Sequence, residues 1–272
     1  YTNIVGKYGQ QVQDVLAKAA TVQINTICPL HGPVWRDNLP WIIEKYDKWS
    51  SYTPEDQGAV MVVYGSVYGG TENAANILAS KLSEGGVRNV AVYDVSKTHV
   101  SELIAEAFRC SHIVFASITY NMGIFTPMKS LLMDLQARKL RQELEGTGVR
   151  VVKNGETVVL VMPGNITFDT NKSNIKANFK PVLDSVAKVI NEFSQTKVQV
   201  TGYTDNTGTA AINNKLSAER ANSVATYLKL RGVASGRVMA AGLGSSNPIA
   251  TNATAAGREQ NRRVEISLIN MQ

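Results

Sequence analysis

The spacing of hydrophobic residues changes in character near residue 140. Before that point, short apolar runs alternate with stretches that have helical periodicity. Strands that alternate with helices of this length are typical of a parallel sheet with right-handed crossovers. The first half is therefore predicted to be α/β. The expected strands are 59–64, 90–93 and 113–117. The expected helices are one that starts at residue 71 or 72 and ends near 84, and two more at 99–109 and 127–140.

After residue 140 the apolar positions follow a different order. Two strand-like runs, 149–152 and 157–162, flank Asn154-Gly155, which is a strong hairpin signal because both residues tolerate positive φ. This half is predicted to be a compact α+β domain of the β-α-β-α-β kind. Its further elements are expected to be a helix at 178–193, a strand at 197–203, a helix at 216–231 and strands at 237–241 and 264–268.

The region before the alternating pattern is harder to interpret. A helix is expected to end near residue 20, a short strand to cover 22–27, and a weak helix to form near 41–49. We therefore divide the chain into three predicted parts. Residues 1–58 form an irregular leading segment and linker, residues 59–140 the α/β domain, and residues 141–272 the α+β domain.

Charge is distributed as unevenly as the hydrophobic pattern. Residues 1–140 hold 12 basic and 12 acidic side chains, whereas residues 141–272 hold 16 and 10, so the whole net charge of +6 lies in the second half. A basic surface attracts anionic polymers, although a well-solvated surface explains the same count equally well. Cys28 and Cys110 cannot form a disulfide framework. No apolar run reaches the length of a membrane helix, and no signal peptide is visible.

Three polar segments of the basic half carry candidate chemistry. They are 168–171 (Phe-Asp-Thr-Asn), 202–208 with the helix that follows, and 257–265 around two adjacent arginines. Each has a simple alternative interpretation. The stretch from Asp205 to Gly208 could be a turn, because Asx residues and glycine favour turns, and Arg220 could pair with Asp205 inside the fold. Adjacent arginines on a terminal strand lie more often on the surface than in a site.

Taken together and in order, these segments resemble the C-terminal domain of the OmpA family, which peptidoglycan-associated lipoproteins and flagellar stator proteins share. The resemblance covers about residues 143–270. It implies non-covalent binding of peptidoglycan through diaminopimelate of the stem peptide, without enzymatic activity. Asp205 would bind the amine of the free end and Arg220 its carboxylate, since an arginine fork holds a carboxylate by two parallel hydrogen bonds.

The resemblance also assigns supporting roles. Hydrogen bonds are expected from Asp169, Thr170, Asn171, Thr204 and Asn213, and packing from Leu216. Arg263 would line the pocket or stabilise the last strand. This interpretation implies a periplasmic, cell-envelope location, and we expect no nucleic-acid partner.

The first half resembles a truncated flavodiiron protein. Residues 27–36, around His31, are similar to the end of its metallo-β-lactamase-like domain, and residues 59–139 are similar to its flavodoxin-like domain. Because the other iron ligands would lie upstream, His31 is expected to be a loop residue and no diiron centre is expected. The loops 66–72 and 117–123 would border FMN. The candidate contacts are Ser66, Tyr68, Gly69, Gly70, Thr71, Thr119, Tyr120 and Asn121.

The predicted sheet is incomplete for a flavodoxin-like fold, which has five strands in the order 2-1-3-4-5. With three strands, it lacks one loop that would hold the flavin ring, so we expect weak FMN binding and no cofactor in the isolated protein. Its open edge strand would require cover from the neighbouring domain or a second chain. The alternatives to wall binding are a cytoplasmic FMN electron-transfer protein and a fusion, natural or artificial, with both activities.

Overall fold

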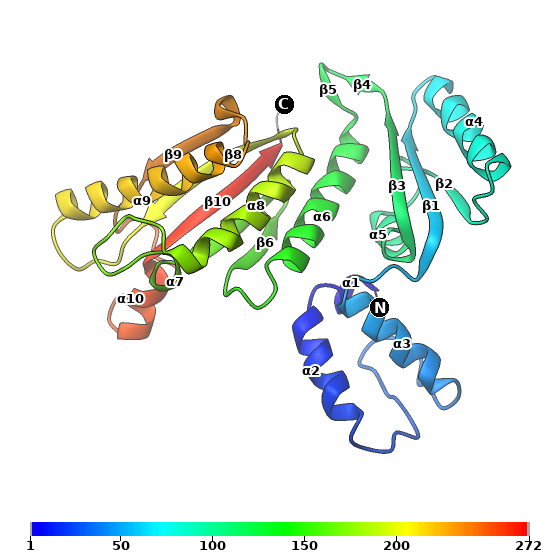
Figure 1. Cartoon of the computed structure of the whole chain (residues 1–272), viewed down its shortest axis with the longest axis horizontal. Helices are drawn as coiled ribbons and strands as arrows, with labels where there is room; N and C mark the ends of the chain where they lie inside the picture. The colour runs from blue at the N-terminus through cyan, green and yellow to red at the C-terminus, as the bar shows by residue number, and fades with distance from the viewer. Residues whose placement is uncertain (1, 271–272) are drawn as a thin grey trace. The chain divides into compact units, whose positions relative to one another are not determined.

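The computed structural model describes residues 2–270 and divides the chain into two compact units, Tyr1–Arg138 and Lys139–Gln272. The division falls within helix α6 (Thr126–Glu143). Among the described residues, no helix combines the length and the apolar character needed to cross a membrane. Figure 1 labels the helices and strands of both units.

The N-terminal unit is built on a parallel sheet in the order β2-β1-β3, as the alternation of strands and helices predicted. Its strands are β1 (Asp56–Gly65), β2 (Val90–Asp94) and β3 (Cys110–Ser117). The helices α4 (Gly70–Glu84) and α5 (Val100–Arg109) connect them. β3 is an edge strand of this sheet, and its Phe115 is 40% exposed.

Alternate residues of β1 are buried on both faces of the sheet. Val60 and Val62 form a cluster with Ala75 of α4, while Met61 and Val63 are 1% and 0% exposed and point to the other face. A strand that is buried on both faces reads as a continuous apolar run. This explains why the pattern at 59–64 located β1 correctly.

The segment before β1 folds into the same compact unit. It contains α1 (Thr2–Val5), α2 (Gly9–Ala19) and α3 (Leu39–Ser50), and Tyr52 stacks on Phe108 of α5 with ring centroids 5.7 Å apart. The strand expected at 22–27 is absent: only an isolated bridge joins Ile27 to Trp35. An apolar run becomes a strand only where a neighbouring strand can satisfy its backbone, and this run has no such neighbour among the described residues.

The C-terminal unit is a five-stranded sheet in the order β6-β7-β10-β8-β9, covered by two long helices. β8 and β9 are parallel, and the other neighbours are antiparallel. The strands are β6 (Arg150–Asn154), β7 (Thr157–Pro163), β8 (Thr196–Tyr203), β9 (Val238–Gly242) and β10 (Arg263–Asn270). The long helices are α8 (Lys180–Glu192) and α9 (Ala210–Leu230).

Short elements complete both units. In the C-terminal unit they are α7 (Gly164–Thr167), η1 (Ala177–Phe179), η2 (Ser235–Arg237) and α10 (Ala255–Asn261). In the N-terminal unit, β4 (Thr119–Tyr120) and β5 (Gly123–Ile124) form a small hairpin. The predicted hairpin between β6 and β7 is confirmed, with Gly155 at φ 57°.

Two helix starts differ from the prediction. α9 begins at Ala210, well before residue 216, because Thr209 caps it by accepting a hydrogen bond from the backbone N of Ile212 at 3.3 Å. α10 was not predicted at all. It begins after Thr254, whose hydroxyl accepts a hydrogen bond from the backbone N of Gly257 at 3.1 Å.

Two glycines allow α9 to lie unusually close to the sheet. Gly202 of β8 and Gly242 of β9 are register partners in the parallel pair. A Cβ atom at Gly202 would lie 2.1 Å from the carbonyl oxygen of Ser217, and one at Gly242 would lie 2.2 Å from the backbone nitrogen of Ala218. Because neither position has a side chain, this part of α9 can approach the end of β8 this closely.

Candidate functional site

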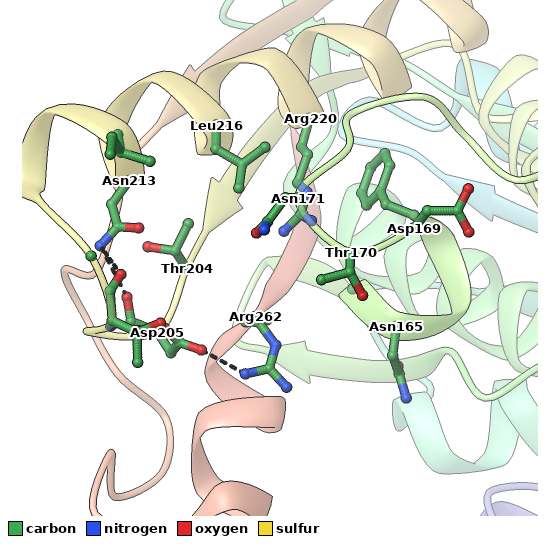
Figure 2. A pocket seen from close by; sticks show the side chains of 15 residues that line it. Asn165, Asp169, Thr170, Asn171, Thr204, Asp205, Asn213, Leu216, Arg220 and Arg262 are labelled. Carbon is green, nitrogen blue, oxygen red and sulfur yellow. Dashed lines mark hydrogen bonds and ion pairs between the residues drawn. The ribbon is translucent and has the colours of Figure 1, made fainter.

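A cavity of about 770 Å³ opens in the C-terminal unit where β8 ends and α9 begins. Its walls come from α7 and the loop that follows it, the loop after β8, the inner side of α9, and Arg262 between α10 and β10. Figure 2 shows polar side chains from these elements pointing into one space. Eight of the nine residues predicted to bind peptidoglycan line it: Asp169, Thr170, Asn171, Thr204, Asp205, Asn213, Leu216 and Arg220.

Asp205 is the buried anion of the cavity, with only 4% of its surface exposed. Its Oδ1 accepts hydrogen bonds from the backbone N of Thr207 at 2.8 Å and from the Thr207 hydroxyl. Its Oδ2 forms an ion pair with Nη1 of Arg262 at 2.5 Å (Figure 2). The side chain of Asn213 donates to the carbonyl oxygens of Asp205 and Thr207, which holds this turn against α9.

These contacts keep Asp205 ionised. Burial by itself raises the pKa of Asp205, but the hydrogen bonds from Thr207 and the charge of Arg262 outweigh it, so the pKa lies below its ordinary value. The turn interpretation and the site interpretation of this segment are therefore compatible. The turn presents a buried, fully charged carboxylate to the cavity.

Arg220 is the buried cation of the cavity, with 5% of its surface exposed. Its Nε donates to the carbonyl oxygen of Lys172 at 3.0 Å, and its guanidinium lies 5.1 Å from the centre of the Phe168 ring. Burial lowers the pKa of Arg220, and the neighbouring charge of Arg262 lowers it further, against the opposing effect of Asp205. A guanidinium has five N–H donors, and within residues 2–270 Lys172 is its one hydrogen-bond acceptor.

Arg220 does not pair with Asp205 in the part of the chain that the structure describes; Arg262 takes that position. Thr204 provides a further group that could bind a ligand. It is 5% exposed, and its buried hydroxyl has no hydrogen-bond partner among the described residues. An unpaired buried hydroxyl is unfavourable, so it indicates a place where a bound group could complete the hydrogen bonding.

The structure corrects the assignment of the two adjacent arginines. Arg263, which was predicted to line the pocket or stabilise the last strand, is 3% exposed and does not line this cavity. Its Nε donates to Glu265 at 2.6 Å, and its guanidinium lies 3.8 Å from the Tyr203 ring centre. Successive side chains of an extended chain point to opposite sides. Arg262 consequently faces the cavity, while Arg263 supports β10.

Sequence reasoning also missed some lining residues whose side chains are small, apolar or amide. They are Gly164, Asn165, Phe168, Thr207, Gly208 and Ile212. The signal for Arg262 was present in the sequence, since it adjoins the arginine that was chosen. The residue at which β10 starts decides whether Arg262 or Arg263 points into the cavity. The hydrophobic pattern did not determine this starting residue closely enough to choose between them.

The predicted flavin loops lie at the ends of β1 and β3 in the N-terminal unit. The Ser66 hydroxyl accepts a hydrogen bond from the backbone N of Gly69 at 3.0 Å, and Gly69, at φ 82°, precedes α4. The other predicted residues of this loop are Tyr68, which is 98% exposed, Gly70 and Thr71. FMN binding here stays a prediction.

The second predicted loop forms the β4–β5 hairpin. Thr119 and Tyr120 lie in β4, Tyr120 packs edge-on against Phe125 at 6.3 Å, and Asn121 adopts φ 48°. His31 lies in the loop between Ile27 and Trp35, as expected. Among the described residues, no group of three His, Cys, Asp or Glu side chains could hold a metal ion.

Comparison with known proteins finds relatives of the C-terminal unit. The OmpA family model matches residues 167–262, a span that contains every cavity residue except Gly164 and Asn165. Over 136 residues, 50% of this chain, the sequence is 48% identical to the probable lipoprotein YiaD of Escherichia coli and covers 62% of that protein. Over 106 residues it is 46% identical to the peptidoglycan-binding protein ArfA of Mycobacterium tuberculosis, 39% of this chain and 32% of ArfA.

Among solved structures, the cell wall anchor of the T6SS from Pseudomonas aeruginosa is 33% identical, with a TM-score of 0.46 over 50% of this chain and 97% of that one. The matched segment spans less than two thirds of both YiaD and ArfA. The family match and these relatives identify the C-terminal unit as an OmpA-like domain. The names of these relatives, a probable lipoprotein and a peptidoglycan-binding protein, agree with the prediction of a protein without enzymatic activity.

Proposed function

We propose that the OmpA-like domain binds peptidoglycan non-covalently, through the free end of diaminopimelate in the stem peptide, and so attaches the chain to the cell wall. One observation carries the proposal: a buried carboxylate, Asp205, and a buried guanidinium, Arg220, line the same cavity without pairing with each other. The name of ArfA, a peptidoglycan-binding protein, supports the same ligand class. The proposal implies a location in the cell envelope, on the side that contains the wall.

The chemistry of the ligand matches this pair of charges. The free end of diaminopimelate has an ammonium and a carboxylate on one carbon, so its recognition requires an anion and a cation close together. Asp205 would accept the ammonium and Arg220 would bind the carboxylate by a bidentate contact. The Thr204 hydroxyl would gain the hydrogen bond that it lacks among the described residues. Asp169, Thr170, Asn171, Asn213 and Leu216 would enclose the rest of this end.

We expect Arg220→Ala to weaken binding to purified diaminopimelate-containing sacculi about ten- to a hundredfold. The change removes a charge-assisted contact of roughly 1.5–3 kcal/mol. A quantitative pull-down measures it, and circular dichroism verifies folding. The matched control is Lys215→Ala on the same helix, where the side chain is 79% exposed. Unchanged binding by a folded Arg220→Ala protein would contradict the proposed site.

One feature of the N-terminal unit would fit a flavodoxin-like fold, namely the parallel strand order β2-β1-β3 with a glycine-containing loop between β1 and α4. This supports a weak site for a phosphate-sized anion at 66–71. We expect FMN titration, followed by fluorescence quenching, to give a dissociation constant weaker than micromolar, because one ring-holding loop is missing and ordering the other costs binding energy. Stoichiometric sub-micromolar binding would favour the electron-transfer alternative instead.

A further inference from the structure

We propose that Arg262 determines which ligand ends the cavity accepts, by exchanging Asp205 for the ligand's carboxylate. In this exchange, the ammonium of the ligand displaces the Arg262 guanidinium from Asp205. The released guanidinium then binds the ligand's carboxylate together with Arg220. The inference rests on the proposed function and adds a selection rule to it: a primary amine without an adjacent free carboxylate is rejected.

The contacts of Asp205 favour such an exchange. Oδ1 is already occupied by the backbone N and hydroxyl of Thr207. Oδ2 is the remaining oxygen, and it holds Nη1 of Arg262 at 2.5 Å. Oδ2 can accept a second donor, but an ammonium bound there would lie beside the guanidinium of Arg262, which has the same charge, so the two cations compete for Oδ2. Because Asp205 is buried, an ion pair that is lost there must be replaced by another.

The backbone of Arg262 is held by hydrogen bonds, while its side chain is partly exposed to solvent. Its carbonyl oxygen accepts a hydrogen bond from the backbone N of Gly164 at 2.7 Å, and its own N donates to the carbonyl oxygen of Arg258 at 3.1 Å. The Arg262 side chain is 39% exposed, in contrast to 5% for Asp205. The guanidinium thus lies on the solvent-exposed side of the cavity lining, whereas the carboxylate of Asp205 is buried.

The balance of charge explains why the carboxylate of the ligand matters. Asp205 is the buried anion of the cavity and lies beside two cations, Arg220 and Arg262. Asp169 also lines the cavity, but its side chain is 60% exposed and lies 3.7 Å from Lys176, so its charge is largely screened by solvent. The charge of Arg262 lowers the pKa of Arg220. A zwitterionic ligand brings a carboxylate that both guanidiniums can share. A bare amine would take Asp205 from Arg262 and add a third cation with no new anion. Like charges in a partly buried site repel strongly, so binding of the bare amine is disfavoured.

The test compares three soluble tripeptides, L-Ala-γ-D-Glu-X, by isothermal titration calorimetry with the full chain. X is meso-diaminopimelate, meso-diaminopimelate amidated at the carboxylate of its side-chain end, or L-lysine, whose side-chain end has an amine and no carboxylate. We expect the native protein to prefer the first over the other two by about a hundredfold. In Arg262→Gln, this preference should fall about tenfold, since one of two carboxylate partners is lost and the competitor for Asp205 is gone.

The matched control is Arg258→Gln. Arg258 lies on α10 and donates to the carbonyl oxygens of Asn252 and Ala253, but it does not line the cavity, so the preference should be unchanged. A folded Arg262→Gln protein that loses affinity for all three tripeptides by the same factor would show that Arg262 only supports the Asp205 turn, and would overturn the inference. Native binding of the amide as tight as that of the free acid would also overturn it, while sacculus binding would remain. A native protein that binds neither tripeptides nor sacculi would contradict the proposed function itself.

Discussion

Gly202→Ala is expected to destabilise the C-terminal unit by about 3 kcal/mol, at the upper end of the cost of overpacking a core. The new Cβ atom would lie 2.1 Å from the carbonyl oxygen of Ser217 and 2.9 Å from its carbonyl carbon. Both are backbone atoms of α9, and β8 is itself held between β10 and β9. No flexible side chain can yield, so the helix must move away from the sheet. Because α9 contributes Asn213, Leu216 and Arg220 to the cavity, ligand binding should be lost as well.

Hydrogen exchange of the amides in β8 and α9 measures this effect within the intact chain. The three tryptophans, Trp35, Trp41 and Trp49, all lie in the N-terminal unit, so their fluorescence reports on that unit as an internal reference. Gly236→Ala is the matched control, since a Cβ atom there meets nothing within 4 Å. The proposed close approach would be refuted if Gly202→Ala changed protection no more than Gly236→Ala.

Asn261→Ala is expected to lower the free energy of unfolding of the C-terminal unit by about 3–5 kcal/mol. The change removes a fully buried amide that makes four hydrogen bonds. Each buried group that is left without a partner costs about 1–3 kcal/mol. Its Oδ1 accepts from the backbone N of Ile249 and Ala250 at 2.9 and 3.0 Å. Its Nδ2 donates to the carbonyl oxygen of Ala250 and to Oδ1 of Asn252, both at 2.9 Å. Oδ1 of Asn252 in turn accepts from the backbone N of Asn206, next to Asp205.

Exchange protection of residues 249–252 and thermal unfolding by circular dichroism measure the loss. Asn191→Ala is the matched control: its exposed amide makes a single hydrogen bond, to the carbonyl oxygen of Arg231 at 3.1 Å. Asn261→Asp keeps the acceptor but replaces the donor by a second carboxylate oxygen, which would face the carbonyl oxygen of Ala250 and Oδ1 of Asn252. At neutral pH it should therefore destabilise the domain at least as much as Asn261→Ala. Equal stability of Asn261→Ala and Asn191→Ala would mean that water replaces the amide.

The sequence pattern predicted those elements in which the buried residues recur regularly along the chain. β1 is buried on both faces and reads as an apolar run, and the turn at Asn154-Gly155 has its own conformational signature. The first turns of α9 were missed because their inner side is polar: Asn213 and Ser217 are buried there against glycine and the Asp205 turn. A helix that faces a binding site instead of a core lacks the apolar repeat from which its start would be recognised.

The sequence reasoning selected residues that line one cavity, but it did not find the partner of Asp205, and the binding role of these residues stays a prediction. Asp205 and Arg220 do line one cavity, as proposed, but the partner of Asp205 is Arg262. Two adjacent arginines carry the same chemical signal, and a shift of one residue in the start of β10 would exchange their roles. The run at 22–27 was misjudged for a related reason, since a strand depends on a neighbour that the local pattern does not contain.

The order of the strands also bears on how the domain is made. β10 follows all the other described strands in the chain, yet it occupies the centre of the sheet, between β7 and β8. During vectorial synthesis, the hairpin β6–β7 and the pair β8–β9 emerge as two separate pieces, each with an open edge, and the last strand joins them. Arg262 immediately precedes that strand, so Arg262 reaches the cavity only when β10 pairs with β7 and β8. Nascent chains therefore have neither a finished sheet nor a selective site, and exposed edges of this kind are where chaperones act and aggregation begins.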